Sequence, residues 1–228
     1  MSSGPITTKG PIERVDERAT SVTDPEPTVF VVDDDPSVRR ATERLVRSMG
    51  FNVRTFASAT EFTDHARVDG PSCLVLDVHL PGLSGLDLQR ELARSGVQIP
   101  IIFITGRGSI PMSVRAMKEG AVEFLTKPTR PRDLLAAIRA AIERDRASQQ
   151  ARREVDALRE RYARLTTRER EVLALVVAGR LNKQIASELA TTERTIKFHR
   201  AHIMEKMGAD SIAELVRLAE HLGVAPEG

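Results

Sequence analysis

Val29-Phe-Val-Val-Asp-Asp-Asp35 is an apolar run that ends in three carboxylates. Near-continuous apolar runs are typical of strands in a parallel sheet covered on both faces, and ligands bind beyond the carboxyl ends of such strands. The polar residues that end these strands are therefore predicted to meet at one edge of one sheet. Three later segments have the same form: Cys73-Leu-Val-Leu-Asp77, Ile101-Ile-Phe-Ile-Thr105 and Glu123-Phe-Leu-Thr-Lys-Pro128.

Helical segments separate these strands. Five β/α units within about 120 residues predict an α/β fold, a doubly wound parallel sheet. The expected elements are strand Thr28–Val32, helix Pro36–Met49, strand Asn52–Phe56, helix Ala59–Ala66, strand Cys73–Asp77, helix Leu86–Ser95, strand Ile99–Thr105, helix Ile110–Glu119, strand Glu123–Thr126 and a long helix from about Arg132.

Composition indicates where the protein works. The chain has 228 residues, of which 41% are hydrophobic, enough for a packed core. It has one cysteine, Cys73, so no internal disulfide can form. It shows neither a membrane-length apolar run nor the apolar core of a signal peptide. A cytoplasmic protein with no membrane partner is expected. The net charge of +2 does not indicate a nucleic-acid partner, which needs a located basic surface.

The chain is predicted to have two domains. Residues 1–27 are rich in Ser, Thr, Pro and charge without periodicity, and a disordered tail is expected there. The α/β domain is expected over residues 28–146, and residues 147–163 alternate in charge like an exposed helical linker. Short helices without strand signals follow over residues 164–228, an all-α helix-turn-helix domain.

The polar strand ends suit phosphoryl chemistry. Asp33 and Asp34 form a pair of hard oxygen ligands for Mg²⁺, and Asp77 would complete the set. Thr105 offers a hydroxyl to a phosphoryl oxygen, and Lys127 offers a positive charge. In-line phosphoryl transfer needs mainly positioning and charge neutralisation, which this set can supply.

These motifs resemble the receiver domain of response regulators. The matching segments are Val31-Val-Asp-Asp34, Leu76-Asp77 with Leu80-Pro81-Gly82-Leu-Ser-Gly85, Ile104-Thr105-Gly106 and Phe124-Leu-Thr-Lys127-Pro128. The resemblance implies that Asp77 accepts a phosphoryl group from the phosphohistidine of a partner kinase. It also implies that Asp34 is the principal Mg²⁺ ligand, aided by Asp33 and by the main-chain carbonyl of His79. Thr105 and Phe124 occupy the positions of the family's switch pair, although Phe124 could equally be an ordinary apolar strand residue.

The C-terminal part shows three helix starts. Thr166-Thr-Arg-Glu169 is a capping box that opens an apolar helix ended by Gly179. Asn182 is expected to cap a second helix, and Thr192 a third that runs from Glu193 to about Met207. A short helix followed by a tight turn and a longer helix is the helix-turn-helix arrangement.

Helical angles divide the third helix into a core side and an outer side. Ile196, Ile203 and Met207 fall within about 20° of one line, which should face the core. Phe198 lies on the outer side, where its ring suits contact with a thymine methyl group. The outer side also holds Arg194, Ala201 and, at its flank, Lys197. Arg200 lies near the core edge and suits a phosphate better than a base.

This part resembles the LuxR-type DNA-binding domain in Leu165-Thr-Thr-Arg-Glu-Arg-Glu-Val-Leu173, Asn182-Lys-Gln-Ile-Ala186, Thr195-Ile-Lys-Phe-His-Arg200 and Lys206-Met-Gly208. The resemblance implies base contacts on the arc of the third helix that holds Lys197, Phe198, Ala201 and Arg194. It implies phosphate contacts from Asn182, Lys183, Thr195 and Arg200. The last helix, Ser211–Leu222, could pair two such domains or simply close the core.

Together the halves resemble the NarL/FixJ response regulators. The resemblance implies a transcription factor whose phosphorylation by a sensor histidine kinase promotes homodimerisation and binding to double-stranded DNA, with RNA polymerase as a further partner. A non-enzymatic role is expected. A metal-dependent phosphohydrolase is a rival, but His79 stands where its second acid/base Asp would be needed. A phosphorylation-independent DNA binder is another, against which the intact acidic set argues.

Overall fold

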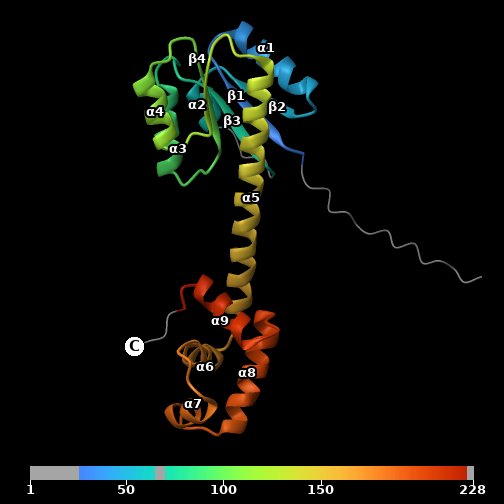
Figure 1. Ribbon diagram of the computed structural model, residues 1–228, viewed down its shortest axis with the longest axis vertical. Helices are drawn as coiled ribbons and strands as arrows, with labels where there is room; N and C mark the ends of the chain where they lie inside the picture. Colours follow the sequence, from blue (N-terminus) through green and yellow to red (C-terminus); the bar gives the residue numbers. More distant parts are fainter. Residues whose placement is uncertain (1–25, 65–69, 225–228) are drawn as a thin grey trace, which may run out of the picture.

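The computed structural model of the protein describes residues 26–64 and 70–224 (Figure 1). A five-stranded sheet with its helices and a bundle of short helices stand at opposite ends of one long helix. The expected tail lies outside the described residues except for Glu26 and Pro27. These two lie against the sheet, because Asn52 donates to the Pro27 carbonyl at 3.2 Å and to the Glu26 carboxylate at 3.0 Å. The boundary of the tail at residue 27 remains a prediction.

The sheet is parallel with the strand order β2-β1-β3-β4-β5, which confirms the doubly wound α/β prediction. The order places β1, β3 and β4, whose ends carry polar residues, side by side in its centre. The strands are β1 (Thr28–Val32), β2 (Asn52–Phe56), β3 (Ser72–Asp77), β4 (Ile101–Thr105) and β5 (Glu123–Thr126).

Both faces of the sheet are covered by helices. Side chains alternate along a strand, so Val29 and Val31 point to one face of β1 and Phe30 and Val32 to the other. The first face packs against α1 (Pro36–Ser48) and α5 (Pro131–Ala163), and the second against α2 (Ala59–Thr63), α3 (Gly85–Arg94) and α4 (Ile110–Lys118). Burial on both faces explains why the central strands β1, β3 and β4 are buried throughout and largely apolar.

Several predicted ends were wrong by one or two residues. Met49, Ser95 and Glu119 are the C-caps of α1, α3 and α4 rather than their last helical residues. Strand β4 begins at Ile101 instead of Ile99, consistent with Pro100 having no N–H to donate to a strand neighbour. The second predicted helix is observed as far as Thr63, and residues 65–66 of that prediction lie outside the described part.

Helix α5 is continuous over 33 residues. Its first part packs on the sheet through Leu134, Ile138 and Ile142, and Leu158 near its end lies in the core of the helical bundle. The last helix of the α/β part and the expected linker are thus one helix, while the domain boundaries at residues 146 and 163 remain predictions. Within residues 26–64 and 70–224, no helix has both the length and the apolar character needed to cross a membrane.

The C-terminal bundle contains α6 (Thr167–Val177), α7 (Asn182–Glu188), α8 (Glu193–Met207) and α9 (Ile212–His221). Ile196, Ile203 and Met207 are fully buried, which confirms the predicted core line of α8. Leu215 and Ala219 of α9 are also fully buried, so these two residues close the core of this chain.

The cap of α7 was predicted wrongly. Leu181 is the N-cap, and Asn182 is the first helical residue. The side-chain oxygen of Gln184 accepts from the Leu181 N–H at 2.8 Å, which satisfies the start of the helix without Asn182. The capping box of α6 is present as predicted, with Thr166 and Glu169 each accepting from the other's main-chain N–H.

Candidate phosphoryl site and nucleic-acid interface

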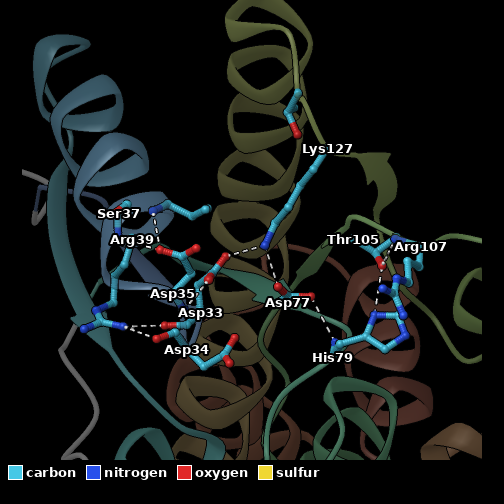
Figure 2. Close-up of polar contacts among 12 residues, drawn as sticks. Asp33, Asp34, Asp35, Ser37, Arg39, Asp77, His79, Thr105, Arg107 and Lys127 are labelled. Carbon is cyan, nitrogen blue, oxygen red and sulfur yellow. Dashed lines mark hydrogen bonds and ion pairs between the residues drawn. The ribbon is translucent and has the colours of Figure 1, made fainter.

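The parallel strands bring the predicted polar residues to one edge of the sheet. Asp33 directly follows β1, Asp77 is the last residue of β3, Thr105 ends β4, and Lys127 directly follows β5. Figure 2 shows their side chains converging beyond the carboxyl ends of the strands. The convergence follows from topology, because strands that run the same way end at the same edge.

Lys127 joins two of the carboxylates. Its Nζ lies 2.8 Å from Oδ2 of Asp33 and 2.5 Å from Oδ2 of Asp77 (Figure 2). Both aspartates are buried, so the attraction is screened far less than at an exposed pair. The ammonium therefore stands next to both the predicted phosphoacceptor and a predicted metal ligand.

Main-chain groups hold the other oxygen of each buried carboxylate. The N–H of Asp35 donates to Oδ1 of Asp33 at 3.0 Å, and the N–H of His79 donates to Oδ1 of Asp77 at 2.9 Å. Asp34 is exposed instead. The two buried carboxylates are thus fixed in orientation, as a site for positioning a phosphoryl group requires.

Charge and burial act against each other at this site. Burial raises the pKa of Asp33, and its bonds to Lys127 and to the Asp35 N–H reduce this rise without cancelling it. Burial lowers the pKa of the Lys127 ammonium, but its bonds to Asp33 and Asp77 outweigh burial and leave that pKa raised. The lysine is therefore held in its charged form, and the pocket favours positive charge beside Asp33.

The carboxylates fit a small divalent cation. One oxygen each from Asp33, Asp34 and Asp77 lie within 4.8 Å of one another. Mg²⁺ binds one or two carboxylates in such sites and keeps several waters, which the exposure of Asp34 to solvent allows. The donor set therefore fits Mg²⁺. The main-chain carbonyl of His79 as a further ligand remains a prediction.

Thr105 and Phe124 contact the same loop. Thr105 is fully buried, and a Cβ placed on Gly108 would lie 3.2 Å from its Cγ2 and 3.1 Å from Cε1 of Phe124. The ring of Phe124 lies 6.2 Å from that of Phe103 in the core. The loop between β4 and α4 is thus packed closely on both residues of the predicted switch pair.

Two contacts at this site escaped the sequence analysis. Arg39 of α1 donates to the main-chain carbonyls of Asp33 at 2.6 Å and Asp34 at 3.4 Å, and so braces the acidic loop. The imidazole Nδ1 of His79 lies 3.1 Å from the Thr105 hydroxyl. Neither contact leaves a signal in the sequence pattern, because both depend on the direction of a long side chain.

Gly85 lies against the main chain of Asp77, the predicted phosphoacceptor. A Cβ at this position would lie 2.3 Å from the carbonyl oxygen of Asp77, and the Gly85 N–H donates to the Val78 carbonyl at 3.0 Å. Glycine is therefore needed for the start of α3 to pack on the end of β3.

Gly85→Ala is expected to destabilise the protein by about 1–3 kcal/mol, the usual cost of forcing extra atoms into a packed region. Phosphorylation should slow as well, because the main chain of Asp77 must shift. Denaturant unfolding and the rate of mass gain with acetyl phosphate would measure the two effects. Gly106→Ala is the control, since nothing lies within 4 Å of its added Cβ. Equal stability of the two variants would contradict the proposed close packing.

The outer side of α8 is exposed as predicted. Arg194, Lys197 and Ala201 are exposed, and Phe198 is 59% exposed. An exposed large aromatic beside two cations is compatible with a surface that contacts nucleic-acid bases and phosphates. Base contacts by these four residues remain a prediction.

Residues predicted to contact phosphates occupy the junction of α7 and α8. Arg200 donates to the side-chain oxygen of Asn182 at 2.5 Å, which ties the two helices together. Thr195 donates its main-chain N–H to the Thr192 hydroxyl at 3.2 Å in the cap of α8. Lys183 is exposed at the start of α7. The bond between Arg200 and Asn182 joins the two helices that would face DNA and fixes their relative placement.

Glu169 links α6 to α8. It is buried, and Lys206 donates to its two oxygens at 2.8 and 2.6 Å. Burial raises the pKa of the Glu169 carboxyl, but its bonds to Lys206 and to Thr166 outweigh burial and leave that pKa lowered. The carboxylate therefore stabilises the fold at pH values above its unfolded pKa, and the stabilisation is lost as the pH falls through its lower folded pKa.

Glu169→Gln is expected to destabilise the protein by about 1–3 kcal/mol near pH 7, because Lys206 loses its charged partner. The variant should also lose less stability than the parent on acidification. Urea unfolding near pH 7 and in acid would measure both effects. Glu171→Gln, an exposed position on the same helix, is the control. If Glu169→Gln lost as much stability on acidification as the wild-type protein, the Glu169 carboxylate would be ruled out as the source of that loss.

Known proteins share both parts of the chain. Residues 29–139 match the response regulator receiver domain, and residues 163–219 match the luxR family of bacterial regulatory proteins. Nodulation protein W of Bradyrhizobium diazoefficiens is 54% identical over 197 residues, covering 86% of this chain and 87% of that protein. Transcriptional regulatory protein FixJ of Azorhizobium caulinodans is 43% identical over 201 residues, covering 87% and 94%. The low-resolution structure of response regulator StyR has a TM-score of 0.78 and 49% identity, covering 86% and 98%.

The fold and the site define a receiver domain joined to a helix-turn-helix domain, which is the architecture of a two-component response regulator. Within that class the chain belongs to the NarL/FixJ family. It is a phosphorylation-dependent regulator of transcription, as the sequence predicted.

Proposed function

We propose that Asp77 accepts a phosphoryl group from the phosphohistidine of a partner sensor kinase. The observation that carries this proposal is the Lys127 ammonium, bonded at once to Asp77 and to Asp33 at the carboxyl edge of the sheet. An oxygen of Asp77 attacks phosphorus in line, an acyl phosphate bond forms, and the P–N bond to the kinase imidazole breaks. The residue acts as the acceptor in this transfer, so the protein is a substrate of the kinase rather than an enzyme.

Mg²⁺ is the proposed cofactor of this transfer. Asp33, Asp34, Asp77 and the carbonyl of His79 would hold it, and when bound it neutralises charge on the phosphoryl oxygens. Lys127 then exchanges its bond to the Asp77 carboxylate for a bond to a phosphoryl oxygen. Arg39 keeps the acidic loop in place through the main-chain carbonyls that it contacts.

The same event is proposed to rearrange α4. The Thr105 hydroxyl turns to a phosphoryl oxygen, and the loop that packs on Thr105 and Phe124 through Gly108 moves with it. That loop leads directly into α4. A change of a few atoms at the end of β4 can thus reach the surface of the receiver domain.

Helix α4 carries the surface that supports homodimerisation. Ile110, Val114 and Met117 are 81%, 47% and 44% exposed. Their spacing places them on one face of the helix, and exposed apolar patches of this kind mark interaction sites. Two such faces brought together would pair two DNA-binding domains, which then bind double-stranded DNA as a dimer. The proposal also includes RNA polymerase as a partner of the DNA-bound protein and a cytoplasmic location. The match of the C-terminal domain to a family of bacterial regulatory proteins supports both.

The proposal is tested with acetyl phosphate and Mg²⁺. The wild-type protein is expected to gain the mass of a phosphoryl group and to shift from monomer to dimer in gel filtration. Val114→Asp should still be phosphorylated but should stay monomeric, because a charge would be buried in the interface. Ala41→Asp on the exposed side of α1 is the control and should dimerise normally. No gain in mass in wild type would contradict the proposed function.

A further inference from the structure

Phe198 of α8 has an aromatic neighbour that the predicted reading surface did not include. The ring of His202, one helical turn further on, has its centroid 4.0 Å from that of Phe198, with an angle of 56° between the planes. The ring of His199 lies further away, at 6.2 Å. Phe198 and His202 therefore form a tilted pair of rings in close contact, and Phe198 remains 59% exposed.

The geometry of a helix explains this pair. Side chains four residues apart lie on one face, and each points back toward the start of the helix. The imidazole of His202 consequently packs against the ring of Phe198 at a tilt. On the other flank of Phe198, residue 201 is an alanine, whose methyl group is too small to cover an aromatic ring. The phenyl ring thus has one close aromatic neighbour, while the ring as a whole stays accessible.

The pair also stands apart from the packing of the bundle. Ile196, Ile203 and Met207 fill the core side of α8, and Lys206 is held by Glu169 of α6. Phe198 is exposed and His202 is partly exposed. An exposed aromatic ring that packs against a neighbouring ring in this way contributes little to the core, but its side-chain conformation is restricted before any ligand arrives.

We propose that His202 is a positioning residue for sequence reading, which holds the Phe198 ring in the orientation that contacts a thymine methyl group in the major groove. The inference rests on the proposed DNA-binding function and adds a determinant of its specificity. A ring fixed in advance loses less conformational freedom on binding than a free one, so discrimination at the contacted base pair improves. The imidazole acts through the contact between the two rings rather than through hydrogen bonds from its nitrogen atoms.

The test uses the full-length phosphorylated protein. Wild-type protein first selects its preferred site from random double-stranded DNA. Binding is then measured to that site and to copies in which each A·T pair is replaced in turn. Phe198→Ala should lose about 5- to 100-fold discrimination at one A·T position. His202→Ala should lose about 3- to 10-fold at that same position.

Two further variants separate the ring-to-ring contact of His202 with Phe198 from hydrogen bonding by its nitrogen atoms. His202→Phe keeps the ring and should retain wild-type discrimination, whereas His202→Gln keeps hydrogen bonding without a ring and should behave like His202→Ala. In the Phe198→Ala background, His202→Ala should have no additional effect on discrimination. Lys183→Ala is the contrast, because losing a predicted phosphate contact should weaken binding to all sequences alike and reduce its salt dependence.

Thermal unfolding of each variant shows whether the fold is intact, and His202→Ala should unfold near the wild-type temperature. Unchanged discrimination in His202→Ala, or its loss in His202→Phe, would overturn the positioning role of His202. Failure of the wild-type protein to select any site is a different result, which would overturn the proposed DNA-binding function itself.

Discussion

Asp77→Asn is expected to abolish phosphorylation by acetyl phosphate or a kinase, with no detectable gain in mass. The amide oxygen is a poor nucleophile, and the variant loses one negative charge from the group that would hold Mg²⁺. The fold should survive, because β3 is buried along its whole length and is apolar from Cys73 to Leu76. Dimerisation and DNA binding should no longer respond to acetyl phosphate.

The contacts of Asp77 set the expected stability of this variant. Asp77 accepts from both Lys127 and the His79 N–H, whereas asparagine has a single acceptor oxygen. The oxygen can stay on the His79 N–H while Lys127 keeps its bond to Asp33, so the free energy of unfolding should change by only about 1 kcal/mol. Urea unfolding and intact mass measured together separate the two effects. Asp156→Asn, on the exposed part of α5, is the charge-matched control. Stoichiometric phosphorylation of Asp77→Asn would show that another residue is the acceptor.

Lys127→Ala is expected to uncouple phosphorylation from its output. Asp77 keeps its nucleophilic oxygen, so the variant should still gain a phosphoryl group in the presence of Mg²⁺, although more slowly. The new phosphoryl group then has no ammonium to bond, and the end of β5 has no reason to rearrange. Gel filtration should show a monomer before and after phosphorylation.

The structure adds a second effect of this change. Without Lys127, three carboxylates within 4.8 Å of one another lose their nearest cation. Stability without Mg²⁺ should fall by about 1–3 kcal/mol, and added Mg²⁺ should restore more stability than it adds to wild type. Melting temperatures with and without Mg²⁺ would measure this. Lys118→Ala, an exposed lysine on α4, is the control. Normal phosphorylation-dependent dimerisation of Lys127→Ala would refute the role of the lysine in the switch.

Features that repeat along the chain were predictable from the sequence. Apolar runs ending in Asp33, Asp77 and Thr105 predicted both the parallel sheet and the edge where these residues meet, because parallel strands all end on the same side. The period of a helix likewise predicted that Ile196 and Ile203 face the core of the C-terminal domain. These inferences needed only local pattern and the direction of each strand.

Local rules failed where a distant residue competed for the same group. Asn182 is a good helix cap by composition, but Arg200 donates to its side-chain oxygen, and Leu181 is the N-cap, whose main-chain N–H donates to Gln184. The ends of α1, α3 and α4 shifted by one residue because the last turn of a helix is set by cap conformation rather than by apolar pattern.

The sequence by itself determined the class of fold, the five polar residues that end the strands at one edge of the sheet and the outer face of α8, since periodicity and strand direction are encoded locally. Tertiary structure alone decided that Lys127 bonds both Asp33 and Asp77, that Arg39 braces the acidic loop, and that Gly85 lies against the main chain of Asp77. These contacts join segments far apart in the chain. Their distances depend on how the helices pack on the sheet, which no pattern within a single segment records.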